Sequence, residues 1–173
     1  RGITWAKGMV RRLTEAEHAK ENMVHALAVG NATIKAKSRV KVAVRTLTQA
    51  IAVCNDGNVT AGVQEARDMI EILQMIIAAR DAIAEASAGA QNALRTRTGY
   101  RDAFQALNVS IHDGIIAGLH QEVEIAEEQL EKLEQFASAD EALMKALARA
   151  PPARAAPNPI FKPDVGATVK FNR

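Results

Sequence analysis

The four histidines of the chain are the first candidates for metal binding. Glu15 and His18 have the Glu-x-x-His spacing with which helical di-iron proteins hold a metal pair. Such a pair needs the motif twice, and His25, His112 and His120 have no glutamate three residues before them. The His-Glu-x-x-His pattern of zinc proteases does not occur either. The sequence therefore predicts no metal site and no cofactor.

Serine and cysteine give no better support for catalysis. None of the serines lies in the Gly-x-Ser-x-Gly turn that exposes a nucleophile: Ser38, Ser87, Ser110 and Ser138. Cys54 ends an apolar stripe beside a turn, so we expect a packed thiol. Residues 57–62 have the glycine spacing of a phosphate loop, but Val63-Gln64 follows where Lys-Ser/Thr is required. The sequence favours a protein that is not an enzyme.

Composition limits the classes of fold that the chain can adopt. Its 173 residues are 48 % hydrophobic and 24 % charged, which is typical of one globular domain rather than a disordered chain. A single cysteine excludes an intramolecular disulfide. No segment reaches the ~18 uninterrupted apolar residues of a membrane-spanning helix. All five prolines lie in residues 151–173, and the proline-free remainder permits long helices because proline costs ~3 kcal/mol inside a helix.

Apolar residues recur every three or four positions through residues 1–150, as on one face of a helix. The spacing predicts a first helix over 3–27. Gly30-Asn31 is then either a helix stop with a new N-cap or a bend in one longer rod. A second helix is expected over 36–54, and the turn residues at 55–58 predict a chain reversal.

The remaining helices follow from the same spacing. A third helix is expected to begin near Val59, where a segment that is apolar on two faces needs neighbours on more than one side, and to end near Thr98-Gly99. A fourth is predicted over 100–133. Ser138 begins a capping-box pattern that predicts a short fifth helix. The predicted fold is all-α: an elongated antiparallel bundle of long helices over 1–150, with an extended proline-rich C-terminal arm.

Two features predict contact with other polypeptides. The C-terminal arm, residues 151–173, carries isolated apolar anchors that suit docking on a neighbouring chain: Ile160, Phe161, Val165, Val169 and Phe171. Gly114 and Gly118 lie four residues apart, so they make a flat spot that another helix can approach closely. This close contact is expected within the bundle or between subunits.

Charge is distributed unevenly along the chain. Residues 1–54 hold ten Lys or Arg and three Asp or Glu, whereas residues 114–149 hold three and eight. Either the basic half packs against the acidic helix, or each faces a partner. The densest basic cluster is a candidate for contact with an anionic partner: Lys35, Lys37, Arg39, Lys41 and Arg45. On one helix, Lys37, Lys41 and Arg45 would stack at four-residue spacing. No aromatic residue lies among them, so nucleic-acid binding is not favoured.

Residues 1–14 combine four basic residues and no acidic residue with Trp5 and several aliphatic side chains. This composition is typical of an organellar transit peptide, or of the mature end just after one, which predicts an organellar, mitochondrial location. The same pattern suits an amphipathic segment at a membrane surface.

The chain is therefore predicted to be a non-enzymatic structural subunit of a large multi-subunit assembly. Its helix faces would pack on other protein subunits, and its C-terminal arm would dock on a neighbouring chain. The alternative is a peripheral helical protein that binds or shapes membranes through its basic half.

Overall fold

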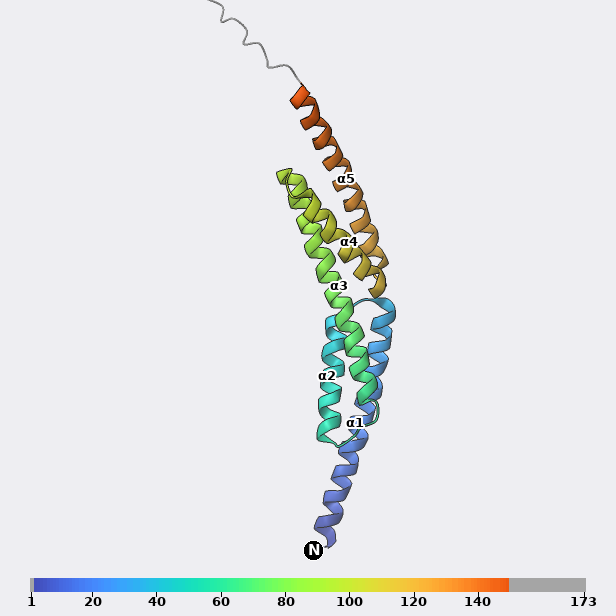
Figure 1. The fold of residues 1–173 in the computed structure, drawn as a ribbon. Helices are drawn as coiled ribbons and strands as arrows, with labels where there is room; N and C mark the ends of the chain where they lie inside the picture. Colours follow the sequence, from blue (N-terminus) through green and yellow to red (C-terminus); the bar gives the residue numbers. More distant parts are fainter. Residues whose placement is uncertain (1, 150–173) are drawn as a thin grey trace, which may run out of the picture.

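The structure is a computed structural model that describes residues 2–149, and the anchors of the C-terminal arm lie outside this range. The described chain forms five α-helices and no strand: α1 Gly2–Ala36, α2 Val40–Asp56, α3 Val63–Thr96, α4 Tyr100–Ala117 and α5 His120–Arg149. The predicted all-α class is confirmed. The helices lie along one long axis, so the described part of the molecule is an elongated rod (Figure 1).

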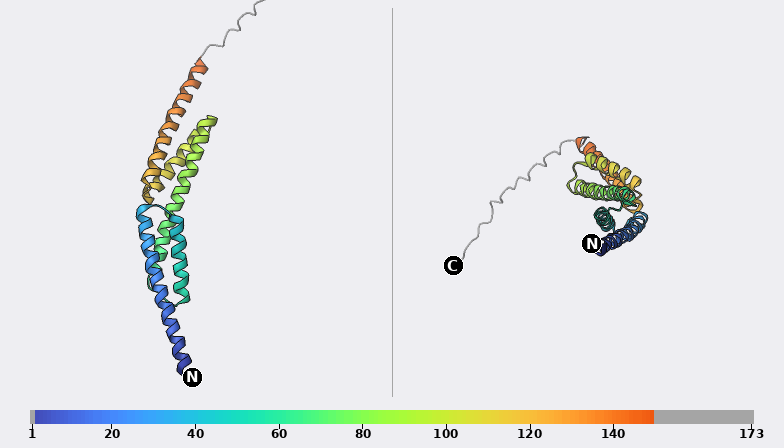
Figure 2. Two further views of the ribbon diagram at one scale, coloured as in Figure 1. Left: turned by 180° about the vertical axis from the view of Figure 1, so that it is seen from behind. Right: turned by 90° about the horizontal axis from the view of Figure 1, so that it is seen from below.

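The rod consists of two groups of three helices that share α3 (Figures 1 and 2). The first half of α3 packs with α1 and α2, which we call the N-terminal bundle. The second half packs with α4 and α5, which we call the C-terminal bundle. No backbone contact within residues 2–149 joins α1 or α2 to α4 or α5. The two bundles are thus connected end to end through one continuous helix.

The buried residues of α3 explain why one helix can serve both bundles. They recur every three or four positions from one end to the other: Val63, Ala66, Met69, Leu73, Ile76, Ala79, Ile83, Ala86, Ala90 and Ala93. This spacing keeps an apolar stripe in contact with neighbouring helices over the whole length of α3. Large side chains predominate in the first half, and alanines in the second.

Gly30 does not stop a helix, because α1 continues through it to Ala36. A Cβ atom at Gly30 would lie 2.9 Å from Met69 Sδ and 3.2 Å from Leu47 Cδ1. The glycine therefore permits α2 and α3 to approach α1 closely. The prediction of a stop at Gly30-Asn31 is wrong, and the alternative of a longer helix describes the chain as far as Ala36.

The turn between α1 and α2 lies seven residues later than the predicted stop. Lys37 and Arg39 both have positive φ angles, of 51° and 54°. Residues other than Gly, Asn and Asp seldom adopt this left-handed backbone conformation. The turn contains neither glycine nor proline, so the sequence has no local signal for it.

Two predicted boundaries agree with the structure. α2 ends at Asp56, and the Val59 amide donates a hydrogen bond to the Cys54 carbonyl oxygen at 2.8 Å, which confirms the reversal at 55–58. α3 ends at Thr96, just before the expected stop. It begins at Val63, four residues after the predicted start.

The predicted fourth helix is divided in two at Gly118. The Gly118 amide donates to the Ile115 carbonyl oxygen at 3.0 Å, and the Leu119 amide donates to that of Gly114 at 2.9 Å. These two bonds form a Schellman cap, which requires the left-handed conformation that Gly118 adopts at φ 69°. Leu119 is buried behind the cap and helps to fix the reversal into α5.

The predicted short fifth helix has no separate start, because α5 is continuous from His120 to Arg149. Ser138 and Asp140 lie inside this helix and not at its N-cap. The Asp140 Oδ2 atom accepts a hydrogen bond from the Tyr100 hydroxyl at 2.7 Å. The carboxylate therefore joins α5 to the start of α4.

Candidate functional site

The histidines do not form a metal centre. His18, His25, His112 and His120 are all exposed and lie on three helices. Glu15 forms an ion pair with Arg11, with 2.8 Å between Oε1 and Nε. Among the described residues, no group of three or more His, Cys, Asp or Glu side chains is placed to hold a metal ion.

Cys54 is a packed thiol, as predicted. It is fully buried, and its Sγ donates a weak hydrogen bond to the Ala19 carbonyl oxygen at 3.4 Å. Burial raises the pKa of the thiol above its ordinary value. The reactive thiolate form is therefore disfavoured, and this side chain serves the packing of α1 on α2.

None of the helices in the described range combines enough length with enough hydropathy to cross a bilayer.

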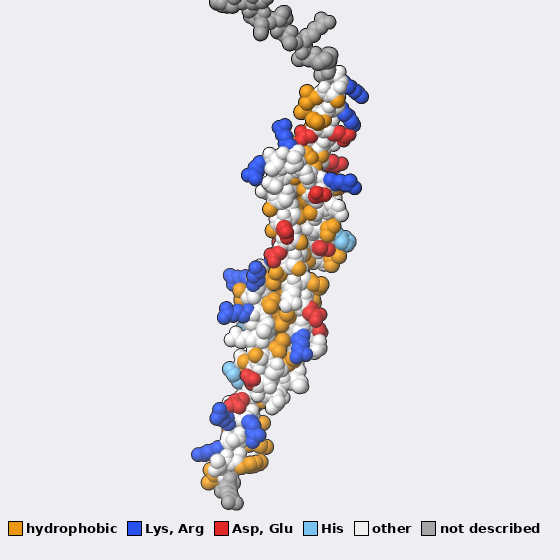
Figure 3. All heavy atoms as spheres, turned by 60° about the vertical axis from the view of Figure 1, so that its left-hand side comes forward, with side chains coloured by type: hydrophobic (Ala, Val, Ile, Leu, Met, Phe, Trp, Pro, Cys, Tyr) orange, Lys and Arg blue, Asp and Glu red, His pale blue; other side chains and the backbone are white. Residues whose placement is uncertain are grey.

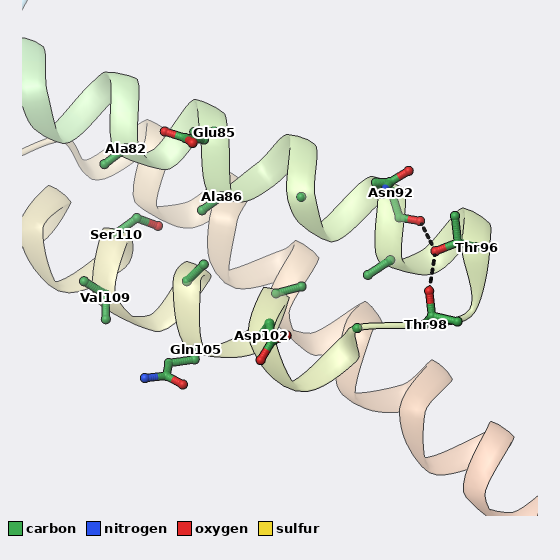
Figure 4. Close-up of a pocket in the computed structure, with 15 residues that line it drawn as sticks. Ala82, Glu85, Ala86, Asn92, Thr96, Thr98, Asp102, Gln105, Val109 and Ser110 are labelled. Atoms are coloured by element: carbon green, nitrogen blue, oxygen red, sulfur yellow. Dashed lines mark hydrogen bonds between the residues drawn. The ribbon is translucent and has the colours of Figure 1, made fainter.

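An open groove of about 810 Å³ runs between α3 and α4 on the C-terminal bundle (Figure 4). We call it the α3–α4 groove. Small side chains such as Ala82, Ala86 and Ala103 line much of it, and Glu85 and Asp102 add negative charge. Lining of this kind offers room for another chain but no arrangement of reactive groups.

A second groove of about 440 Å³, the junction groove, lies where the two bundles meet. Its lining includes Ile72, Met75 and Ile116, all of which are exposed. Ala82 lines both grooves, so the two surfaces adjoin. Together they place exposed apolar side chains along α3.

Both ends of the rod consist of single helices. The α1 overhang, residues 2–18, has no fully buried side chain among those described, and the first buried residue after it is Ala19. The α5 overhang, residues 141–149, is exposed throughout. Both overhangs carry large apolar side chains: Ile3, Trp5, Met9, Val10 and Leu13 on α1, and Leu143, Met144 and Leu147 on α5.

The predicted basic cluster is divided by the turn between α1 and α2. Lys35 ends α1, Lys37 and Arg39 lie in the turn, and Lys41 and Arg45 lie one helical turn apart on α2. The prediction that Lys37 stacks with Lys41 and Arg45 on one helix is therefore wrong. Figure 3 shows Lys and Arg side chains gathered on one side near the middle of the rod. Contact of this cluster with an anionic partner stays a prediction.

The explanation that the basic half of the chain packs against the acidic helix is wrong. The basic half forms α1 and α2, whereas the acidic segment forms α5, and no backbone contact joins them within the described range. The charge difference thus lies along the rod axis. One ion pair joins α3 to this acidic helix, between Arg80 Nε and Glu122 Oε1 at 2.7 Å.

The two glycines predicted as an interaction site have separate structural roles. Gly114 is buried, and a Cβ atom there would lie 2.7 Å from both Ile83 Cδ1 and Val123 Cγ2. The expected close approach of helices thus occurs within the chain, among α3, α4 and α5. Gly118 caps α4, and the Lys37 side chain lies beside it. A contact of either glycine with another chain stays a prediction.

Sequence reasoning missed the α3–α4 groove. Its signal is a stripe of small residues at helical spacing on α3: Ala82, Ala86, Gly89 and Ala93. The sequence predicted a third helix that is apolar on two faces; one stripe of α3 is buried along its whole length, whereas Ile72 of the other face is exposed at the junction groove.

The chain matches no protein-family model, and no curated protein or solved structure shows significant similarity to it.

Proposed function

We propose that the chain is a structural subunit that spans a distance within a larger protein assembly. The observation that carries this proposal is the apolar seam of α5, which extends past the end of its bundle. Leu133 is buried in the seam, and Met144 and Leu147 continue it at the same helical spacing although they are 66 % and 60 % exposed. A helix of another subunit would cover these side chains.

The shape of the rod supports the same proposal. α3 belongs to both bundles without a break, so bending the rod at its middle would disrupt a continuous helix. The adjoining grooves along α3 offer further surface for protein contact. Docking of the C-terminal arm on a neighbouring chain belongs to this proposal as the second means of attachment.

Substitutions that place negative charge on the apolar seam of α5 test the proposal. Met144→Glu with Leu147→Glu should abolish association with the subunits that co-purify with the chain from its source. Ala142→Glu with Ala146→Glu adds the same charge on the other side of α5 and should leave association intact. Light scattering and mass spectrometry of the purified complexes measure the outcome. Equal association of both variants would refute a protein contact at this seam.

Removal of residues 151–173 tests the arm separately. Helicity and the melting temperature should remain almost unchanged, because the described bundles make their contacts without these residues. The shortened chain should be released from its complex. Unfolding of the isolated rod after this deletion would contradict a docking role.

A further inference from the structure

The α1 overhang has an exposed apolar face that no described residue covers. Ile3 is 76 % exposed, Val10 62 % and Leu13 61 %. At 3.6 residues per turn, these side chains fall with Ala6 and Met9 within about 120° of the helix circumference. The overhang is thus an amphipathic helix, and it extends from the bundle as a single helix (Figure 1).

Positive charge borders this apolar face on both edges. Helical spacing places Lys7 beside Ile3 on one edge, and Trp5 and then Arg12 beside Met9 on the other. Arg11 lies on the polar side, where Glu15 neutralises it. Lys7 and Arg12 form no ion pair within residues 2–149, so two cations beside the apolar face are available to a partner.

The acid-free segment of the sequence coincides with the exposed part of α1. The first acidic residue is Glu15, and the helix begins to be covered at Ala16, which is half-buried, and at Ala19. The α5 overhang differs, because Glu141 and Lys145 pair with each other on its polar side. Within residues 2–149, the α1 overhang thus places two unpaired cations, Lys7 and Arg12, beside its apolar face, whereas the α5 overhang has one cation without an ion pair, Arg149.

We propose that the α1 overhang binds the surface of an anionic lipid bilayer. The helix lies in the plane of the interface, its apolar face is directed toward the acyl chains, and Lys7 and Arg12 contact lipid phosphates or carboxylates. Trp5 lies at the edge of that face, where an indole ring suits the boundary between headgroups and acyl chains. Long basic side chains at the same edges can extend to the headgroups while their methylenes remain buried.

Charge disfavours the competing occupant, a second copy of the same overhang. Two copies packed face to face over residues 3–13 would bring the Lys7 and Arg12 side chains of both helices together, because this segment contains no carboxylate. An anionic lipid surface offers the opposite charge. The inference goes beyond the structural role proposed above, and it does not depend on that role.

Trp5 is the single tryptophan of the chain, so intrinsic fluorescence reports directly on this helix. Vesicles of phosphatidylcholine and phosphatidylserine should shift the emission of the full chain to shorter wavelength and carry the chain upward in flotation. High salt should weaken binding because it screens the surface potential. An unchanged spectrum and no flotation at low salt would overturn the proposal.

Variants separate the two components of binding. Leu13→Glu should abolish the shift, because it places a charge in the centre of the apolar face. Lys7→Gln with Arg12→Gln should weaken vesicle binding about fivefold for each charge removed. Arg95→Gln with Arg101→Gln makes the same change of net charge at the distant end of α3 and α4, and should bind as the parent does. Equal loss in both double variants would show that only net charge matters, and would refute the site.

Self-association is measured in the same experiment. A blue shift that increases with protein concentration in the absence of vesicles, together with doubling of the mass in light scattering, would identify a second copy as the occupant and overturn the proposal. Circular dichroism should confirm that every variant retains its helices, because the substituted residues lie outside the buried core.

Discussion

The two bundles have the same number of helices but receive different side chains from α3. The N-terminal bundle is filled by large side chains, among them Met23, Leu47 and Leu73. In the C-terminal bundle, α3 presents mainly alanines, such as Ala86 and Ala90. Alanine permits a close approach of α4 but buries little apolar area. The difference lies in what α3 contributes, because α4 and α5 still bury large side chains such as Leu107 and Leu133 in the C-terminal bundle.

The largest expected effect comes from removing a large side chain from the N-terminal bundle. Leu73 is fully buried, and Leu73→Ala should lower the free energy of unfolding by about 3 kcal/mol through lost burial and a cavity. Gln74→Ala, at an exposed neighbouring position, should change it by less than about 0.5 kcal/mol. Urea unfolding followed by circular dichroism measures both. Similar midpoints for the two variants would show that this core does not determine stability.

Each bundle has a buried glycine inside a helix, Gly30 in α1 and Gly114 in α4, and the two should respond differently to substitution. Gly114→Ala should destabilise the protein by about 2 kcal/mol, since its Cβ atom meets branched side chains on two helices at 2.7 Å. At Gly30 the nearest atom is the sulfur of Met69, a flexible side chain that can move aside. Gly30→Ala should therefore be nearly neutral, because the gain in helix propensity of ~1 kcal/mol offsets the strain. Thermal melting of both variants checks this order, and a reversed order would contradict it.

Two of the tight turns differ in the residues that they place at positive φ. The α4–α5 turn uses Gly118, whereas the α1–α2 turn uses Lys37 and Arg39. Gly118→Ala should lower the free energy of unfolding by about 1 kcal/mol, and Arg39→Gly should raise it by a similar or smaller amount, because left-handed backbone disfavours a Cβ atom. Denaturant midpoints measure both changes. A loss of stability in Arg39→Gly would show that its side chain contributes more than its backbone strain costs.

These glycines and turns also explain which parts of the fold could be predicted. Apolar spacing predicted helices through the described chain, because burial of one face is a property of the sequence itself. Helix boundaries were less predictable, since a glycine has two uses. Gly118 ends a helix, whereas Gly30 remains helical where α2 and α3 approach α1. Only the tertiary neighbours distinguish the two cases.

The exposed surfaces could be predicted from the sequence only where they depend on local spacing and not on tertiary neighbours. The acid-free pattern of residues 1–14 is local, so the sequence revealed its amphipathic character. The α3–α4 groove depends on the reversal at Gly99, which brings α4 back along α3. The sequence also could not predict that the charge difference lies along the rod axis, because this depends on the placement of α1 and α5 in different bundles.

The smallest expected effect concerns an electrostatic difference between the bundles. Arg80 and Glu122 join α3 to α5, whereas in the described structure no ion pair joins two helices of the N-terminal bundle. Partial burial alone would raise the pKa of Glu122, but hydrogen bonds from the backbone and from Arg80 outweigh it and lower the pKa below 4.5. The lowered pKa means that the ionised carboxylate stabilises the folded state above pH 4.5, and that this contribution is lost as pH falls below that value.

Glu122→Gln should therefore lower the free energy of unfolding at pH 7 by about 0.5 kcal/mol, as expected for a pair that is partly accessible to solvent. The difference from the parent chain should disappear at acidic pH, where the parent has also lost the charge. Urea midpoints of both proteins across this range measure the effect. A difference that persists in acid would show that Glu122 acts through packing, and that the two bundles do not differ in their response to pH at this contact.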